Sequence, residues 1–138
     1  MYKVGITGTR SGMNDTQLIH VRSRLNVIIE YYDIAQFHHG DCVGVDFEAA
    51  NIAMDEGYEI VCHPPIKEDL RAFHNSDEFR EPLSYFARNR NIVDESNILF
   101  VVPYLNKWEG KGGTDYTFHY AKKIGKETII FWPDGRIE

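Results

Sequence analysis

Short apolar runs alternate along this chain with longer segments whose apolar residues recur at the 3.6-residue spacing of an α-helix. A short apolar run bounded by turn residues predicts a strand, and the helical spacing predicts a helix with one apolar face. The predicted strands cover Tyr2–Ile6, Ile34–His38, Tyr58–Cys62, Asn97–Val102 and Thr128–Trp132. The predicted helices run from a cap at Asn14 or Asp15 to Tyr32, and over Val45–Glu56, Glu81–Glu95 and Thr114–Ile124.

Residues 64–80 interrupt this alternation, because they are polar, mixed in charge and without a pattern. We expect them to pass over the edge of the sheet, with a short helix around Lys67–Phe73. Elsewhere the alternation predicts a parallel sheet with right-handed crossovers and helices on both faces. A length of 138 residues suits one hydrophobic core. The sequence therefore predicts one α/β domain over residues 1–138, a three-layer arrangement with a parallel sheet of about five strands.

Three glycine-rich turns follow predicted strands: Gly5–Arg10, His39–Asp46 and Gly110–Thr114. Glycine allows tight turns and close approach of the backbone to a ligand. A strand, a glycine turn and a helix place free N–H groups and the positive helix end at one point, which favours phosphate. The carboxyl ends of parallel strands share one edge, so we expect the turns to converge on one anion site. The dinucleotide G-x-G-x-x-G and P-loop patterns are both absent from the first turn.

The candidate ligand-binding residues come from these turns and from one helix. The turns contribute Gly8, Thr9, Arg10, Ser11, Gly40, Asp41, Gly44, Asp46, Gly112, Gly113, Thr114 and Thr117, and the helix contributes Arg88, Asn89 and Arg90. The competing interpretation of the first turn is a plain strand-to-helix connection, and that of Asp46 is a helix cap. Asp115 would compete with a ligand for the positive end of the last helix.

The arginine-rich helix carries an ambiguity about which arginine is buried. Arg90 falls inside the apolar stripe that the pattern assigns to Leu83, Phe86, Ala87 and Val93. A buried charge is costly unless paired, so we expect Arg90 to meet a carboxylate, a carbonyl or a ligand phosphate. Arg88 and Asn89 lie on other faces and could reach the ligand edge, and a solvated position suits Arg88 better than Arg90.

The composition and charge of the chain argue against several classes of protein. The formal net charge of −6 argues against broad binding to a nucleic-acid backbone, which needs a basic surface. No run approaches the ~20 apolar residues of a membrane helix, and no secretory leader pattern opens the chain. Cys42 and Cys62 do not suggest a disulfide framework, and a reduced, cytoplasmic location fits best. The histidines lack metal-ligand spacing, so we predict neither a metal nor a cofactor.

Four motifs occur in order along the chain: Gly5-Ile6-Thr7-Gly8-Thr9-Arg10, Gly40 to Asp46, Ala87-Arg88-Asn89-Arg90 and Gly112-Gly113-Thr114. In these motifs nearly the whole chain resembles the SLOG superfamily, which contains DNA-processing protein A and the Lonely Guy phosphoribohydrolases. It is most similar to the small YspA/YpsA-like branch of bacteria and phages. The resemblance implies a Rossmann-like fold and a nucleotide or nucleotide-derived ligand. Thr117 stands where the Lonely Guy enzymes carry their glutamate, which argues against that form of hydrolysis.

Three functions follow from this combination of turns, arginines and resemblance. The first is binding of a nucleotide-type small molecule, for sensing or sequestration. The second is hydrolysis of the N-glycosidic bond of a nucleoside 5′-monophosphate, with Asp46 or Glu48 as the carboxylate. The third is a single-stranded DNA-binding module, which the acidic balance disfavours. We also expect a homo-oligomer, because Tyr31, Tyr32 and Phe37 could form an aromatic interface.

Overall fold

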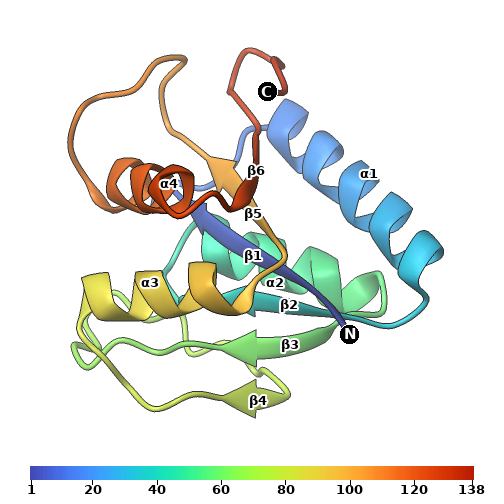
Figure 1. The fold of residues 1–138 in the computed structure, drawn as a ribbon, viewed down its shortest axis with the longest axis horizontal. Helices are drawn as coiled ribbons and strands as arrows, with labels where there is room; N and C mark the ends of the chain where they lie inside the picture. The colour runs from blue at the N-terminus through green and yellow to red at the C-terminus, as the bar shows by residue number, and fades with distance from the viewer.

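The computed structural model describes all residues, 1–138, and contains one sheet of six parallel strands (Figure 1). The strands are β1 (Tyr2–Gly8), β2 (Ala35–His39), β3 (Glu59–Cys62), β4 (Glu78–Phe79), β5 (Ile98–Val102) and β6 (Glu127–Ile130). The helices are α1 (Asp15–Tyr32), α2 (Val45–Asp55), α3 (Tyr85–Glu95) and α4 (Gly113–Lys123). The predicted α/β class with a parallel sheet is confirmed, and the one added strand is β4.

The strand order β4-β3-β2-β1-β5-β6 explains where a ligand crevice can form. The chain moves outward from β1 through β2 and β3, and then returns to the other side of β1 to form β5 and β6. Gly8 at the end of β1 pairs in register with Val102 at the end of β5. The connections that leave these two neighbouring strands diverge to opposite faces, and such a switch point leaves a crevice at the carboxyl edge.

Alternate residues of the strands build two cores, one on each face of the sheet. On one face, Val4 and Phe100 pack with α1 and α2 residues such as Leu25 and Ala49. On the other face, Leu99 packs with residues from α3 and α4 in a smaller cluster. The predicted three-layer arrangement is therefore present, and Figure 1 shows α3 and α4 lying on the opposite side of the sheet from α2.

Local signals correctly placed the start of the longest helix. The Asn14 side chain accepts from the Gln17 backbone N–H at 2.8 Å, and the Gln17 side chain accepts from the Asn14 N–H at 3.1 Å. This reciprocal capping box satisfies two backbone donors that the first turn otherwise leaves free. The buried Gln17 amide also donates to the carbonyl oxygens of Pro103 and Phe131. The start of α1 is thereby joined to the ends of β5 and β6.

The segment 64–80 does not contain the expected helix around Lys67–Phe73. It forms only a turn at Asp69–Leu70, because the Ala72 N–H donates to the Asp41 carbonyl and the Arg71 guanidinium donates to the Asp41 carboxylate. Phe73 has a φ of 54°, which ends any helical path there. The segment finishes as β4, an edge strand that pairs with β3.

Two further expectations were wrong in detail. Helix α3 begins at Tyr85 rather than near Glu81, because Leu83 pairs with the chain after β3 and donates to the Pro64 carbonyl. Phe37 is fully buried instead of contributing to an exposed aromatic surface, since its position in β2 faces the core. Tyr31 is exposed, and its role in an oligomer stays a prediction.

Neither cysteine forms a disulfide. None of the helices is both long and apolar enough to cross a membrane.

Candidate functional site

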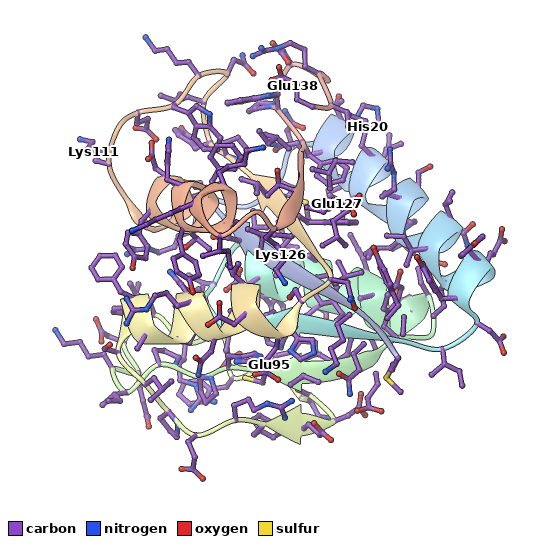
Figure 2. The ribbon with its side chains drawn as sticks, in the orientation of Figure 1. His20, Glu95, Lys111, Lys126, Glu127 and Glu138 are labelled. Carbon is purple, nitrogen blue, oxygen red and sulfur yellow. The ribbon has the colours of Figure 1, made fainter.

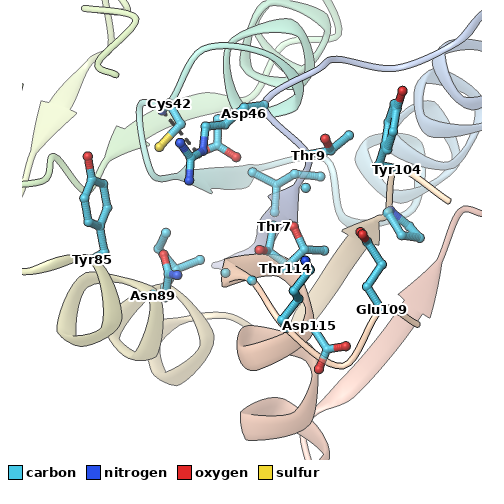
Figure 3. A pocket seen from close by; sticks show the side chains of 18 of the residues that line it. Thr7, Thr9, Cys42, Asp46, Tyr85, Asn89, Tyr104, Glu109, Thr114 and Asp115 are labelled. Atoms are coloured by element: carbon cyan, nitrogen blue, oxygen red, sulfur yellow. Dashed lines mark hydrogen bonds between the residues drawn. The ribbon is translucent and has the colours of Figure 1, made fainter. Parts of the chain in front are cut away.

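A cleft of about 380 Å³ opens at the carboxyl edge of the sheet, where β1 and β5 end (Figure 3). Its walls come from the first glycine turn, the start of α2, one side of α3, the loop 103–112 and the start of α4. The predicted residues that line it are Gly8, Thr9, Arg10, Asp46, Arg88, Asn89, Gly112, Gly113 and Thr114. The predicted residues outside the lining are Ser11, Gly40, Asp41, Gly44, Glu48, Arg90 and Thr117. All three turns thus reach one edge, and the role of these residues in binding stays a prediction.

Asp46 is the only one of the three acidic residues in and just after the second turn, Asp41, Asp46 and Glu48, that lines the cleft. Asp41 is fully buried, and its carboxylate accepts from Arg71 Nε at 2.7 Å and from the His74 N–H at 2.9 Å. Glu48 points to the chain before α1, where it accepts from the Met13 N–H at 2.7 Å. Of the two carboxylates considered for catalysis, Asp46 is therefore the one that lines the cleft.

The expected burial of the two arginines is reversed. Arg88 is only 4% exposed, whereas Arg90 is half-buried and donates to the Tyr116 hydroxyl at 2.8 Å. The inward face of α3 is set by Ile92, and Arg88 lies one turn before it on the same face. Phe86, which the predicted stripe placed inside, is exposed.

Arg88 joins α3 to the ends of two strands. Its Nη1 donates to the carbonyl oxygens of Gly40 and His63, the latter at 3.2 Å. Its Nε donates to Asn89 Oδ1 at 2.7 Å. An arginine side chain has only donors, so it fixes which end of the Asn89 amide faces it. The amide nitrogen Nδ2 of Asn89 therefore points away from Arg88 and toward the start of α4, 3.8 Å from an ideal Cβ built on Gly113.

The start of α4 provides the free backbone donors of the cleft. Its cap is Gly112, which has no side chain to cap the helix, and the first intrahelical bond runs from the Tyr116 N–H to the Gly112 carbonyl. Asp115 does not compete for these donors, because its carboxylate accepts from the Gly110 N–H at 2.9 Å and pairs with His119. The N–H groups that open the helix are thus available for an anion, which the positive end of the helix favours.

Several backbone N–H groups in and just after the first glycine turn already donate hydrogen bonds within the protein. The Thr9 N–H donates to the Val102 carbonyl at 3.1 Å, and the Ser11 N–H donates to Thr9 Oγ1 at 3.2 Å. The Gly12 N–H donates to the Thr9 carbonyl. The plain strand-to-helix interpretation therefore describes most of this backbone, and Gly8, Thr9 and Arg10 of the turn line the cleft.

Asp46 is a buried carboxyl group in the wall of the cleft (Figure 3). It does not cap α2, because its Oδ2 accepts from the Gly40 N–H at 3.2 Å and from the Cys42 N–H at 3.3 Å. Burial raises the pKa of Asp46 from 3.8 to about 6, although Arg88 and these two N–H groups act in the opposite direction. A carboxyl group with such a pKa exchanges protons readily near neutral pH.

The substitution Asp46→Asn is expected to raise the free energy of unfolding at about pH 7.5 by about 2 kcal/mol. Because the folded pKa lies above the unfolded value, the stability that Asp46 contributes is fully present below about pH 4 and is lost as the pH rises through about 6. The gain from asparagine should therefore disappear at about pH 4. Urea unfolding at the two pH values measures this, and an equal gain at both would contradict the raised pKa.

The loop 103–112 supplies cleft residues that the sequence patterns did not single out. Lys107, Lys111 and Glu109 are exposed there, and none of them forms a hydrogen bond or ion pair within the chain. Arg10, across the cleft, is likewise exposed and without a partner. For Lys107, Glu109 and Lys111, the only signal in the sequence that could have indicated a role in the site is their position in or just before the third glycine turn. The cleft lining holds four cationic side chains, of Arg10, Arg88, Lys107 and Lys111, and three acidic ones, of Asp46, Glu109 and Asp115, so it is slightly basic in a chain whose formal net charge is −6.

Comparisons with known proteins found related folds but no close relative. No family model matches the chain, and no curated protein matches it. A molybdenum cofactor binding protein from the phototrophic bacterium Rippkaea orientalis aligns with a TM-score of 0.68 and 20% identity, over 94% of this chain and 75% of that protein. The molybdenum cofactor carrier protein of Chlamydomonas reinhardtii aligns with a TM-score of 0.65 and 20% identity, over 94% of this chain and 75% of that protein.

DNA processing protein A from Helicobacter pylori, which binds single-stranded DNA, aligns with a TM-score of 0.63 and 18% identity. The alignment covers 94% of this chain and 64% of that protein. At these identities the likeness establishes the fold. Together with the strand order, it shows that the chain shares the Rossmann-like α/β fold of these proteins.

Proposed function

We propose that the cleft binds a nucleotide or nucleotide-derived anion, with a phosphate at the start of α4. The observation that carries this proposal is the convergence of three kinds of donor in one cleft. The backbone N–H groups that open α4 lie beside the Asn89 amide nitrogen, which Arg88 holds in a donating orientation. The exposed side chains of Arg10 and Lys111 add positive charge at the rim. Phosphate is the anion that such a helix start most often holds.

The remaining surface of the cleft suits the heterocyclic part of such a ligand. Phe86 and Tyr104 line the cleft and are 53% and 58% exposed. The Phe86 ring packs against Tyr116, with 4.5 Å between ring centroids, whereas Tyr104 has no aromatic neighbour and can stack on a base. A volume of about 380 Å³ lies within the range of small-molecule sites. Proteins of this fold that bind the molybdenum cofactor or single-stranded DNA support the choice of ligand class.

The ligand can be identified by native mass spectrometry of the purified protein, before and after incubation with a pool of nucleotides and nucleotide second messengers. We expect an intact nucleotide to be retained at one equivalent per chain. An oligothymidylate in a separate incubation tests the single-stranded DNA alternative. Retention of the oligonucleotide, without any mononucleotide or dinucleotide, would replace the proposed ligand class by a nucleic acid.

The substitution Asn89→Asp is expected to weaken binding of the retained nucleotide by about 2–3 kcal/mol, or about 30- to 150-fold in Kd. The carboxylate removes the donor that faces the start of α4 and places negative charge against the phosphate. Isothermal titration calorimetry measures the change. Asn91→Asp is the matched control, because Asn91 is exposed on the same helix and does not line the cleft. Equal weakening in both variants would show a general charge effect and contradict the assignment.

A second candidate function rests on the raised pKa of Asp46. An N-glycosidase needs a carboxylate near the developing oxocarbenium ion, together with an activated water. Asp46 lines the cleft, whereas Thr117 donates from its buried hydroxyl to the Gly113 carbonyl. Release of free base from a nucleoside monophosphate, abolished in Asp46→Asn, would assign hydrolysis to this site. Retention of the intact nucleotide would favour binding alone.

A further inference from the structure

A second group of buried polar side chains lies between the sheet and the last turn of α3, beyond the cleft lining. His38 of β2 and His63, just after β3, are 2% exposed or less. Glu95 ends α3 directly over them, and its side chain is 29% exposed. Figure 2 labels Glu95 at this end of α3, above β3. The nucleotide proposal uses none of these three side chains.

The hydrogen bonds around His38 fix where its ring carries a proton. Gln36 Nε2 donates to the Glu59 carboxylate at 2.9 Å, so the Gln36 carbonyl oxygen is the end that faces His38. That oxygen accepts from His38 Nε2 at 3.0 Å. The lone pair of His38 therefore lies on Nδ1, which is 2.8 Å from His63 Nε2.

Glu95 presents one of its two oxygens to the histidines. Arg80 donates to Oε1 through Nη2 at 2.8 Å and through Nε at 3.2 Å. Oε2 is engaged more weakly by Arg80, at 3.3 Å, and lies 3.7 Å from His63 Nε2. Glu78 also accepts from Arg80 at 2.8 Å, so two carboxylates share one guanidinium. Oε2 is therefore the Glu95 oxygen that is left to approach the two rings.

We propose that His38, His63 and Glu95 form a binding site for a divalent transition metal of the Zn²⁺ type. The three ligand atoms, His38 Nδ1, His63 Nε2 and Glu95 Oε2, lie within 4.8 Å of one another. Bonds of about 2.0–2.1 Å in a tetrahedral zinc site separate neighbouring ligand atoms by roughly 3.3 Å. The observed separations of 2.8 and 3.7 Å lie on either side of that value. The third pair, His38 Nδ1 and Glu95 Oε2, lies within 4.8 Å, so rotation of these side chains is needed to place all three atoms around one ion.

The partners of two of these ligands, His38 and Glu95, match those found around bound metals. A metal-bound histidine usually donates its other ring N–H to an oxygen, and a ligating carboxylate is itself hydrogen-bonded. His38 donates from Nε2 to the Gln36 carbonyl oxygen, and Glu95 accepts from the Arg80 guanidinium. On metal binding, the neutral ring of His63 carries its proton on Nδ1 instead of Nε2, so no net proton is released. Two imidazoles and one carboxylate favour Zn²⁺ over Mg²⁺ or Ca²⁺ and leave one position open.

The other buried histidine group in the chain lacks this free ligand capacity. His39 accepts from the Asp41 N–H through Nδ1 and contacts Ser76 Oγ through Nε2. Both oxygens of the Asp41 carboxylate accept hydrogen bonds, from Arg71 and from the His74 N–H. Each oxygen of Asp41 is thus held by a hydrogen bond of 2.9 Å or less, tighter than the 3.3 Å bond to Glu95 Oε2, so the proposal is confined to His38, His63 and Glu95.

The test is a titration of the chelator-treated full chain with Co²⁺, followed by visible absorption, with no nucleotide present. We expect one equivalent of Co²⁺ to bind, with the strong d–d absorption of a four-coordinate site, and Zn²⁺ to displace it. Glu95→Gln should weaken Co²⁺ binding at least tenfold. Because Glu95 is partly exposed, this variant is expected to keep its fold, which far-ultraviolet circular dichroism checks.

His119→Gln is the matched control, because His119 is an exposed histidine paired with the carboxylate of Asp115 on α4. The proposal requires this variant to bind Co²⁺ as the unaltered chain does. Absence of a one-equivalent site in the unaltered chain would overturn the proposal. Unchanged affinity in Glu95→Gln, or a loss confined to His119→Gln, would overturn it as well. The nucleotide measurements are made without metal, so either proposal can fail independently of the other.

Discussion

Replacing Arg88 by methionine is expected to lower the free energy of unfolding by about 3–5 kcal/mol. Methionine keeps much of the volume of the arginine stem but removes every donor. The carbonyl oxygens of Gly40 and His63 would then be buried without the guanidinium, and Asp46 would lose its nearby positive charge. Urea unfolding at neutral pH measures the loss. The Asn89 amide would also lose its orientation, so nucleotide binding should fall with stability.

Arg90→Met is the matched control for this prediction, because it makes the same chemical change two residues along α3. Arg90 is half-buried and makes one side-chain hydrogen bond, to the Tyr116 hydroxyl. We expect its loss to cost about 1 kcal/mol or less. Equal destabilisation by the two substitutions would mean that the contacts of Arg88 with the strand ends carry little of the stability of the fold.

The second large effect is expected at Gly44, where alanine should lower the free energy of unfolding by roughly 3–4 kcal/mol. Gly44 has a φ of 91°, and an ideal Cβ on it would lie 2.3 Å from the Arg10 carbonyl oxygen. The obstructing atoms belong to the backbone, so no side-chain rotation relieves the contact. Moving Arg10 would also displace one wall of the cleft, and nucleotide affinity should fall in calorimetric titrations.

Gly57→Ala separates the two causes of this loss. Gly57 also has a positive φ, of 99°, but an added Cβ there meets nothing within 4 Å. It therefore reports the backbone strain alone, which we expect to cost about 1–2 kcal/mol. If Gly44→Ala costs no more than Gly57→Ala, the close packing of the second turn against the first does not contribute to stability.

Elements with a strong local pattern were predicted correctly, whereas elements that depend on contacts with distant residues were not. Helix α1 was predicted to within one residue, because its capping box and apolar spacing lie within a few positions of each other. Strand β4 was missed, because its two exposed residues carry no pattern and depend on pairing with β3. The expected helix around Lys67–Phe73 fails for a similar reason. Its Arg71 and Ala72 bond to Asp41, 30 and 31 positions earlier in the chain.

The arginines of α3 show the same division within the candidate site. Helical spacing allowed two inward faces, and the apolar residues near the start of the helix favoured the one that contains Arg90. The face that is buried contains Arg88, because its guanidinium donates to the carbonyl oxygens of Gly40 and His63. These two residues precede Arg88 by 48 and 25 positions in the chain. No local pattern contains such contacts, since they depend on the order and register of the strands.

The sequence by itself determined the α/β class, the parallel sheet and the place of its glycine turns at one edge. Each of these follows from spacings of a few residues, which local backbone geometry enforces. Only the tertiary structure decided that Asn89 faces the start of α4, that Glu48 leaves the cleft and that His38 meets His63 beneath Glu95. These arrangements join residues that are 24 or more positions apart, and the crossovers between strands bring them together.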